Sequence, residues 1–216
     1  KIDEPLYRGR VNSCMAGICA NYKEYSLALL FYERALKNFE RSGNEWYYAQ
    51  SLLNVSQCYV YLHRFGNADS LLNIAQTYQL DSAYMARYYE TNGLYFYELH
   101  QYDSALVYFQ IGLSYWHSEQ DKCFSWLKLM QIYYHTNQVN HAVFYSNKLI
   151  SISNNPNYLA NAYYCLLLDA KAQNNAIRMS EYTHARSDAQ RLLHNQSNQY
   201  AKAIPQLENY FQDPHP

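Results

Sequence analysis

Apolar residues recur three and four positions apart along nearly the whole chain. Leu27, Leu30, Phe31, Ala35 and Phe39 are one such run, and this spacing is that of an α-helix rather than of a β-strand. Clusters of turn-forming residues interrupt the pattern at regular intervals. The pattern therefore predicts an all-α protein built from antiparallel helix pairs at about 6–21 with 25–42, 45–62 with 65–79, 82–99 with 102–118, 121–136 with 139–152, and 157–173 with 176–196.

Several of the interrupting residues predict how individual helices end and begin. Gly43 suits the left-handed backbone that closes a helix. Asn44, Asp81 and Asn155 can each accept a hydrogen bond from the free amides of a following first turn, and Pro156 is tolerated at a first helical position. We therefore expect helices to start after these three polar residues.

The helix pairs repeat a pattern of large and small side chains. Ala28, Ala68, Ala105 and Ala142 are 40, 37 and 37 residues apart, by subtraction of their positions. The residue nine positions before each alanine is Cys19, Tyr59, Phe96 and Tyr133 in turn, and the residue twelve before, small in three cases of four, is Ala16, Ser56, Gly93 and Met130. A repeat of this length predicts a stacked array, because one helix pair cannot bury its apolar face alone.

The C-terminal part of the chain follows the pattern less closely. Ser180 takes the place of the alanine in the fifth pair, and Pro205 is expected to interrupt the last apolar stripe. The prediction is thus a single domain over residues 1–216, with clear repeats over about 6–152, a degenerate repeat over 157–196 and a partial or capping helix over 198–212.

This pattern resembles the tetratricopeptide repeat. The third repeat matches it best, with Tyr89, Gly93, Phe96, Tyr102, Ala105 and Phe109 in order. The units are longer than the family's repeat of about 34 residues, and the family's proline after the second helix is missing. The resemblance implies a right-handed superhelix of about five antiparallel helix pairs that binds a protein or peptide without catalysis.

Composition and charge narrow the classes of function. The 216 residues include 17 basic and 18 acidic side chains without a long run of either sign, which argues against nucleic-acid binding. No apolar stretch approaches the roughly 18 to 20 residues that cross a bilayer, so we expect no membrane insertion by this region. Five cysteines without CxxC spacing are expected to be small buried thiols rather than disulfides or zinc ligands.

Sequence motifs for catalysis, metal binding or cofactor binding are absent. The chain has no phosphate-binding loop, HExxH, GxSxG or EF-hand motif, and its eight histidines do not converge. His63 and His100 hold equivalent ends of first helices, where the helix dipole favours an imidazolium. Glu90 and Glu98 lie two turns apart on one helix face, and a paired-carboxylate hydrolase is the enzymatic alternative. We expect no enzyme, cofactor or metal.

The resemblance implies that the first helices line a concave binding face. Adjacent tyrosines in a helix point about 100° apart, so one ring of each doublet is expected in the core and its neighbour outside. The Lys and Asn pairs with which some arrays clamp a C-terminal carboxylate are not found at the matching positions, such as Leu53 with Gln57 and Glu90 with Leu94. By register, the candidate partner-binding residues are Gln57, Tyr61, Arg87, Glu90, Tyr97, Phe124, Gln131 and Tyr134.

Two other functions stay open from the sequence. Exposed tyrosine and tryptophan rings could stack on a glycan or another small molecule, or the array could be a structural spacer that forms homo-oligomers. A looser resemblance is to the repeat regions of bacterial membrane-anchored or envelope regulators, and the chain begins at Lys1 rather than Met. This resemblance implies the interaction region of a larger regulator in the bacterial cytoplasm or cell envelope, with envelope tethering favoured.

Overall fold

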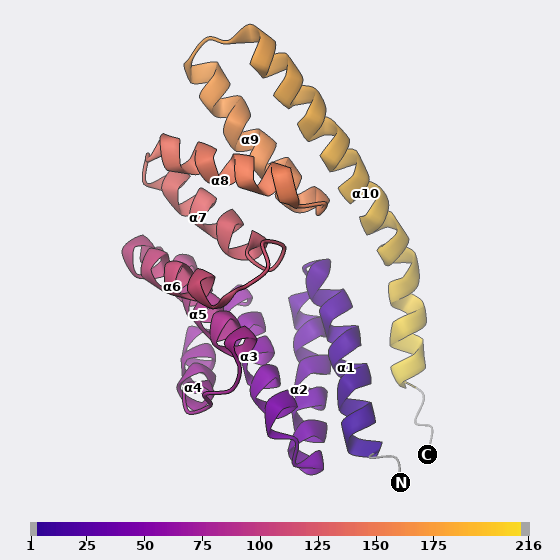
Figure 1. Cartoon of the computed structure of the whole chain (residues 1–216). Coiled ribbons are helices and arrows are strands. Elements are labelled where there is room, and N and C mark those ends of the chain that lie inside the picture. Colours follow the sequence, from indigo (N-terminus) through magenta and orange to yellow (C-terminus); the bar gives the residue numbers. More distant parts are fainter. Residues whose placement is uncertain (1–3, 213–216) are drawn as a thin grey trace. The chain divides into compact units, whose positions relative to one another are not determined.

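The computed structural model describes the backbone of residues 4–212 and the side chains of residues 4–201. Helices connected by short turns make up this part of the chain, without any strand, which confirms the all-α prediction for it (Figure 1). The helices are α1 (Glu4–Asn21), α2 (Tyr25–Ser42), α3 (Glu45–Tyr61), α4 (Phe65–Ala75), α5 (Ser82–Glu98), α6 (Tyr102–Tyr115), α7 (Cys123–His135), α8 (Val139–Ile152), α9 (Pro156–Ala172) and α10 (Ala176–Gln212).

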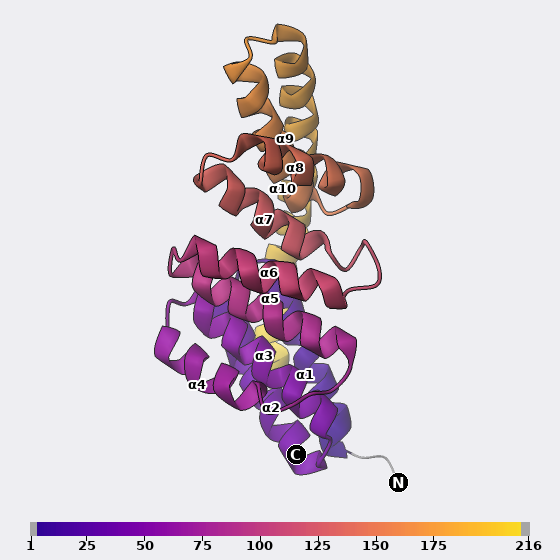
Figure 2. The same ribbon diagram turned by 60° about the vertical axis from the view of Figure 1, so that its left-hand side comes forward.

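The chain divides into two compact units, Lys1–Lys128 and Leu129–Pro216. In the first unit α1 packs on α2, α3 on α4 and α5 on α6, and the pairs are also joined through α2 with α3 and α3 with α5 (Figures 1 and 2). In the second unit α8 packs on α9 and α9 on α10. Each unit is therefore built from antiparallel helical hairpins.

One turn geometry recurs in all five hairpins of the described chain. The second residue after each first helix has a left-handed backbone, with φ between 53° and 66° at Lys23, His63, His100, Asn137 and Asn174. The following amide donates to a carbonyl five residues back in every case, at 2.7–3.0 Å, as in Glu24 to Cys19 and Gln101 to Phe96. This is the Schellman motif, which satisfies carbonyls at the end of a helix. His63 and His100 thus define the turn, a role beyond the predicted dipole effect.

The recurring turn also tests the predicted register. Ala28, Ala68, Ala105 and Ala142 all lie five residues after a left-handed residue, and all have an exposed fraction of 0%. In the fifth hairpin, however, this position belongs to Met179, whose amide donates to Asn175 at 3.0 Å. The prediction of Ser180 was wrong by one residue, because the helix ends at a polar Asn pair that allows either alignment by sequence alone.

Small residues allow close contact between paired helices. A Cβ atom added at Gly93 of α5 would lie 3.0 Å from the ring of Phe109 on α6. At Gly9 of α1 it would lie only 2.5 Å from the ring of Phe39 on α2. Both rings are fully buried, so these glycines let an aromatic ring lie directly against the neighbouring helix backbone.

The predicted helix ends are confirmed at the capping residues. Gly43 has a φ of 66° and closes α2. Asn44 accepts the Tyr47 amide at 3.1 Å, Asp81 accepts the Tyr84 amide at 2.7 Å, and Asn155 accepts the Asn157 amide at 2.9 Å. Pro156 is the first residue of α9. The second helix of the second hairpin is shorter than the predicted 65–79, because α4 ends at Ala75 in a turn of shorter-range hydrogen bonds.

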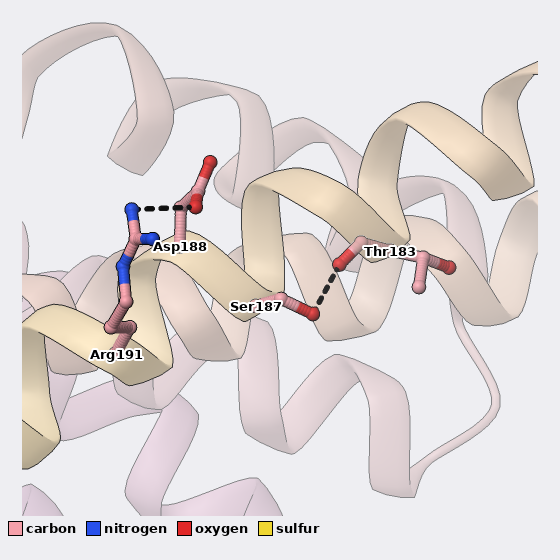
Figure 3. A network of polar contacts seen from close by, with 4 residues as sticks. All are labelled: Thr183, Ser187, Asp188 and Arg191. Atoms are coloured by element: carbon pink, nitrogen blue, oxygen red, sulfur yellow. Dashed lines mark hydrogen bonds and ion pairs between the residues drawn. The ribbon is translucent and has the colours of Figure 1, made fainter.

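The predicted break near residue 197 and the interruption at Pro205 are wrong. Helix α10 runs without a break from Ala176 to Gln212. Proline removes one backbone hydrogen bond, at a cost of about 3 kcal/mol in a helix interior, but a helix can continue past it. On its exposed side α10 carries local polar contacts: Arg191 pairs with Asp188 at 3.1 Å, and the Ser187 hydroxyl donates to the Thr183 carbonyl at 2.9 Å (Figure 3).

The cysteines follow the sequence expectation with one exception. Cys19, Cys58, Cys123 and Cys165 are buried free thiols, whereas Cys14 is exposed. Burial raises the pKa of the Cys58 thiol to about 12. A thiol that stays protonated is a poor nucleophile and a poor metal ligand, so Cys58 serves packing.

Candidate functional site

Several buried or half-buried charged and polar side chains of the first unit lie on α2, α3, α5 and α7. We call this set the polar face: Tyr32 of α2, Asn54 of α3, Arg87, Glu90 and Glu98 of α5, and Lys128 of α7. On α5 the acidic and basic members are spaced three and eight residues apart, which places them on one side of the helix. Three of the six, Arg87, Glu90 and Glu98, thus come from the central helix of the set.

Glu90 is a buried carboxylate with two hydrogen-bond donors. Only 7% of the residue is exposed, and its Oε1 atom accepts from the Trp116 indole at 2.9 Å and from the Ser125 hydroxyl at 2.6 Å. Burial raises the pKa of Glu90 to about 7, although both hydrogen bonds and the Arg87 charge act to lower it. Sequence register had placed Glu90 in an open groove, but it lies inside the polar face, where a partner could not reach it without rearrangement.

Arg87 lies one turn before Glu90 and reaches toward α3. Its Nη2 atom donates to Oδ1 of Asn54, and the side chain is half-buried. Desolvation lowers the pKa of Arg87, and the nearby Tyr32 and Glu90 oppose that effect. The guanidinium keeps its charge at neutral pH, because its ordinary pKa is above 12. Arg87 therefore brings a positive charge onto the polar face.

Lys128 crosses from α7 to the rings of two other first helices. Its Nζ atom lies 4.2 Å from the ring centre of Tyr97 on α5 and 5.9 Å from that of Tyr61 on α3. It also pairs with Glu98 at 3.8 Å, and the ring of Tyr25 stacks on Tyr61 at 4.2 Å. Only 8% of Lys128 is exposed, and burial lowers its pKa to about 8. Cation–π contacts thus replace much of the water around this ammonium.

The structure brings together some of the predicted binding residues. Tyr61 and Tyr97 share Lys128, whereas Arg87, ten residues before Tyr97 on α5, contacts Asn54 of α3. Phe124 is half-buried and packs edge to face on Phe109, with ring centres 6.2 Å apart. Gln57 is half-buried on α3. Within the first unit, the predicted set is therefore divided between groups that line a face and groups that fill the core.

Gln131 and Tyr134 belong to the second unit. Gln131 is half-buried, whereas 42% of Tyr134 is exposed. The neighbouring Tyr133 is buried and stacks on Tyr145 of α8 at 5.8 Å, so this doublet divides between core and surface as predicted. The Tyr88 and Tyr89 doublet does not, because both rings are half-buried and contact each other at 5.4 Å.

Sequence reasoning missed the residues that hold the charged groups in place. Lys128, Asn54, Trp116, Ser125 and Tyr32 were not selected. One signal was available for Lys128. It lies nine residues before Asn137, the left-handed turn residue of its hairpin. The same position holds uncharged residues in the other four hairpins: Cys14, Asn54, Thr91 and Cys165. A charge at a position that is otherwise uncharged indicates a local function.

Two hollows lie elsewhere in the first unit. A cavity of about 330 Å³ between α2, α3 and α4 is lined by Glu33, Leu36, Val55, Tyr59, Gly66, Asn67, Ser70 and Leu71. The Tyr59 hydroxyl donates to Glu33 there at 2.9 Å. A second, of about 200 Å³, lies at the turn between α2 and α3, beside Tyr48 and Tyr78. The first is large enough for a small polar ligand.

The described side chains include no group of three or more His, Cys, Asp or Glu residues that could hold a metal ion. Within the described helices, none is long and apolar enough to cross a membrane. No family model matches the chain. No curated protein matches it either. The functional interpretation therefore depends on the side chains of the polar face themselves.

Proposed function

We propose that this chain is a noncatalytic α-solenoid of the tetratricopeptide type, and that its first helices bind a protein or peptide partner. The recurring Schellman turn and the four fully buried alanines support a repeat architecture. One observation carries the functional proposal: Lys128 of α7 lies over rings of α5 and α3. Charged and aromatic groups from three first helices give a face both contact area and directional bonds.

The cost of this arrangement favours recognition over a purely structural spacer. Burial lowers the pKa of both Lys128 and Arg87. The charged forms of these two side chains are therefore less stable in the folded protein than in water. Apolar residues of similar size at such positions are often neutral or stabilising by about 1–4 kcal/mol. The protein thus keeps two desolvated cations in the first unit, which supports a role in binding.

Peptide selection tests the proposal directly. Random peptides displayed on phage would be selected on the chain, and their affinities compared between the native protein, Tyr61→Ser and Val107→Ser. Val107 is the matched control, because it is exposed on α6, a second helix. We expect Tyr61→Ser to weaken binding about tenfold, as loss of an aromatic anchor does, and Val107→Ser to leave it unchanged. Equal losses in both variants, or no selected peptide, would rule out the aromatic rings around Lys128 as the binding surface.

The 330 Å³ cavity favours a second candidate, binding of a glycan or another small polar molecule. Its lining combines a carboxylate, an amide and hydroxyls with an apolar floor, which suits a polyhydroxy ligand. Gly66 borders this cavity, and a Cβ atom added there would meet no neighbour within 4 Å. Binding on a glycan array that is lost in Gly66→Leu, with peptide binding retained, would favour this candidate over the first.

The resemblance to bacterial envelope regulators extends the proposal to a cellular setting. In that setting the chain would be the interaction region of a larger bacterial regulator tethered to the cell envelope. Fractionation of cells that express the full-length gene product tests it. Recovery of the protein in the soluble cytoplasmic fraction alone would contradict the tethering.

A further inference from the structure

The smaller hollow, at the turn between α2 and α3, combines aromatic walls with carboxylates. It has a volume of about 200 Å³ and is lined by Phe39, Glu40, Gly43, Asn44, Glu45, Tyr48 and Tyr78. Pockets for drug-sized ligands begin at roughly 300 Å³, so this hollow fits one chemical group of a ligand rather than a large molecule. The chemistry of the lining indicates which group that is.

Two tyrosine rings from different segments form the walls. Tyr48 belongs to α3, and Tyr78 lies between α4 and α5. Their ring centres are 6.3 Å apart, and the ring planes meet at 61°. Both side chains are half-buried and pack against the buried cluster around Leu52 and Leu72. The core therefore holds the two rings in position before a ligand binds, which lowers the cost of ordering them on binding.

The hollow is closed on the core side and open at the turn. Phe39 is 1% exposed and stacks on Tyr47, with ring centres 5.0 Å apart, so it forms the buried side of the hollow. Gly43 is exposed, and a Cβ atom added there would meet no neighbour within 4 Å. A ligand can therefore enter from the side of the turn.

Two carboxylates give the hollow a negative charge. Glu40 near the end of α2 and Glu45 at the start of α3 are both exposed, and neither makes an ion pair with any residue whose side chain is described. The partial charges of the two helix ends, about half an elementary charge each, are opposite in sign and largely cancel. Among the described side chains, no lysine or arginine lies over the ring of Tyr48 or Tyr78. The lining therefore selects a cation from outside.

We infer that this hollow binds an alkylammonium group, the chemistry that choline and methylated lysine share. The face of an aromatic ring attracts a cation through the ring quadrupole. Methyl groups present that positive charge on an apolar surface, which can contact the tyrosine rings directly. An unmethylated ammonium is compact and strongly hydrated, and its three N–H donors need acceptors. The carboxylates add attraction that requires no N–H donor on the ligand.

This site is separate from the peptide-binding face proposed above. Glu45 and Tyr61 are the two ends of α3 and lie 16 residues apart, or about 24 Å at 1.5 Å per residue. None of the residues that line the hollow contacts Lys128 or its two rings. Binding of an alkylammonium group is therefore a further activity of the first unit, and it can be tested alone.

Choline tests the site without a partner protein. We would titrate choline with the whole protein at constant ionic strength and follow the ¹H signal of its three equivalent methyl groups. Methyl protons above an aromatic ring shift upfield, so we expect a saturable upfield shift. The control ligand is 3,3-dimethylbutan-1-ol, which has the same shape with carbon in place of the charged nitrogen, and we expect it to bind at least about tenfold more weakly. No saturable shift with choline, or equal affinity for both ligands, would overturn the inference.

Substitutions identify the walls. Tyr48→Leu removes the ring but keeps an apolar side chain against the core, and should weaken choline binding about tenfold, whereas Tyr48→Phe keeps the ring and should bind as the native protein does. Tyr108→Leu is the matched control, because Tyr108 is a half-buried tyrosine of α6 outside the hollow. Circular dichroism at 222 nm checks the fold. Should Tyr48→Leu not fold, Tyr78→Leu outside the helices replaces it with the same expectation. Equal losses in the wall variant and in Tyr108→Leu would contradict the site.

A second substitution tests the charge. The double variant Glu40→Gln with Glu45→Gln should weaken choline binding at least about threefold, because two carboxylates at close range attract a cation even in water. Glu24→Gln removes an exposed carboxylate just before α2 and should leave the affinity unchanged. An unchanged affinity in the double variant would show that the hollow selects shape alone, and would overturn the inference of a cation site.

Peptides identify the source of the group. A peptide with one trimethyllysine and the same peptide with unmodified lysine would be compared with choline. Tighter binding of the trimethylated peptide assigns the group to a protein partner, and tighter binding of choline assigns it to a free small molecule. Equal affinities for the two peptides would contradict an alkylammonium site. Tyr61→Ser should bind choline as the native protein does, so failure of this site and failure of the proposed peptide face are distinguishable.

Discussion

Replacing Glu90 with Gln should make the protein more stable at pH 8 and leave it nearly unchanged at pH 5. Glu90 is 7% exposed, and a single oxygen, Oε1, accepts both the Trp116 and the Ser125 hydrogen bonds. Glutamine keeps an oxygen at that position and has nearly the same volume. The substitution therefore removes the ionisation of the side chain and preserves its packing.

The magnitude follows from the pKa of the buried carboxyl. Burial raises this pKa from 4.5 to about 7. Between these values the folded protein holds a proton that the unfolded chain releases, so the stability conferred by the protonated form is complete below pH 4.5 and is lost as the pH rises through 7. At about 1.4 kcal/mol per pKa unit, the loss amounts to roughly 3 kcal/mol. Glu90→Gln cannot ionise and should not show it.

Urea unfolding followed by circular dichroism, at half-unit steps from pH 4.5 to pH 8, measures the effect. The free energy of unfolding of the native protein should fall relative to that of Glu90→Gln, and the two curves should separate by roughly 3 kcal/mol at pH 8. Glu40→Gln, which removes an exposed carboxylate at the end of α2, is the control and should follow the native curve. Parallel curves for the native protein and Glu90→Gln would refute the assignment of a destabilised buried carboxylate.

Four further predictions concern packing and charge. Lys128→Met should raise the free energy of unfolding at pH 7 by about 1–3 kcal/mol, because burial makes the charged form of Lys128 less stable in the folded protein than in water. Because burial lowers the pKa of Lys128 to about 8, the native protein should gain stability above pH 8 relative to this variant, and urea unfolding at pH 7 and 9.5 checks both points. Gly9→Ala should destabilise by about 1–3 kcal/mol, because its Cβ would lie 2.5 Å from the Phe39 ring. Gly66→Ala, which meets no neighbour within 4 Å, should instead stabilise by up to about 1 kcal/mol, so equal thermal midpoints would contradict the packing. Ala105→Leu should overpack the third hairpin by about 1–3 kcal/mol, and an unchanged midpoint would count against the register.

Helix positions could be predicted from sequence because local rules set them. The side chains of Asn44, Asp81 and Asn155 cap the helices that follow, and each cap depends only on residues within three positions. The error at Pro205 has a similar origin. A proline weakens a helix locally, but whether the helix continues depends on the total stability of both flanking segments, which a local rule does not contain.

The polar face could be predicted only in part, since it depends on contacts between distant residues. Register along the repeats was sufficient to select Tyr61 and Tyr97, whose rings both contact Lys128. It could not show that Trp116, 26 residues beyond Glu90, donates to that carboxylate and buries it. Burial changed Glu90 from a groove residue into an internal titrating group. No sequence spacing encodes that difference, because the loop that carries Trp116 has no periodic pattern.

The recurring left-handed turn makes the chain modular at the level of its backbone. His100 and Asn137 are 37 residues apart and have φ values of 59° and 58°. A duplicate of residues 101–137 inserted after Asn137 would therefore leave and re-enter the chain at residues of nearly equal φ, without a new linker. Gene duplication could lengthen such a protein one hairpin at a time, and an engineer could do the same. Neither shortening nor extension would require a redesign of the turn. Only the side chains at the new contact between helices would need to change.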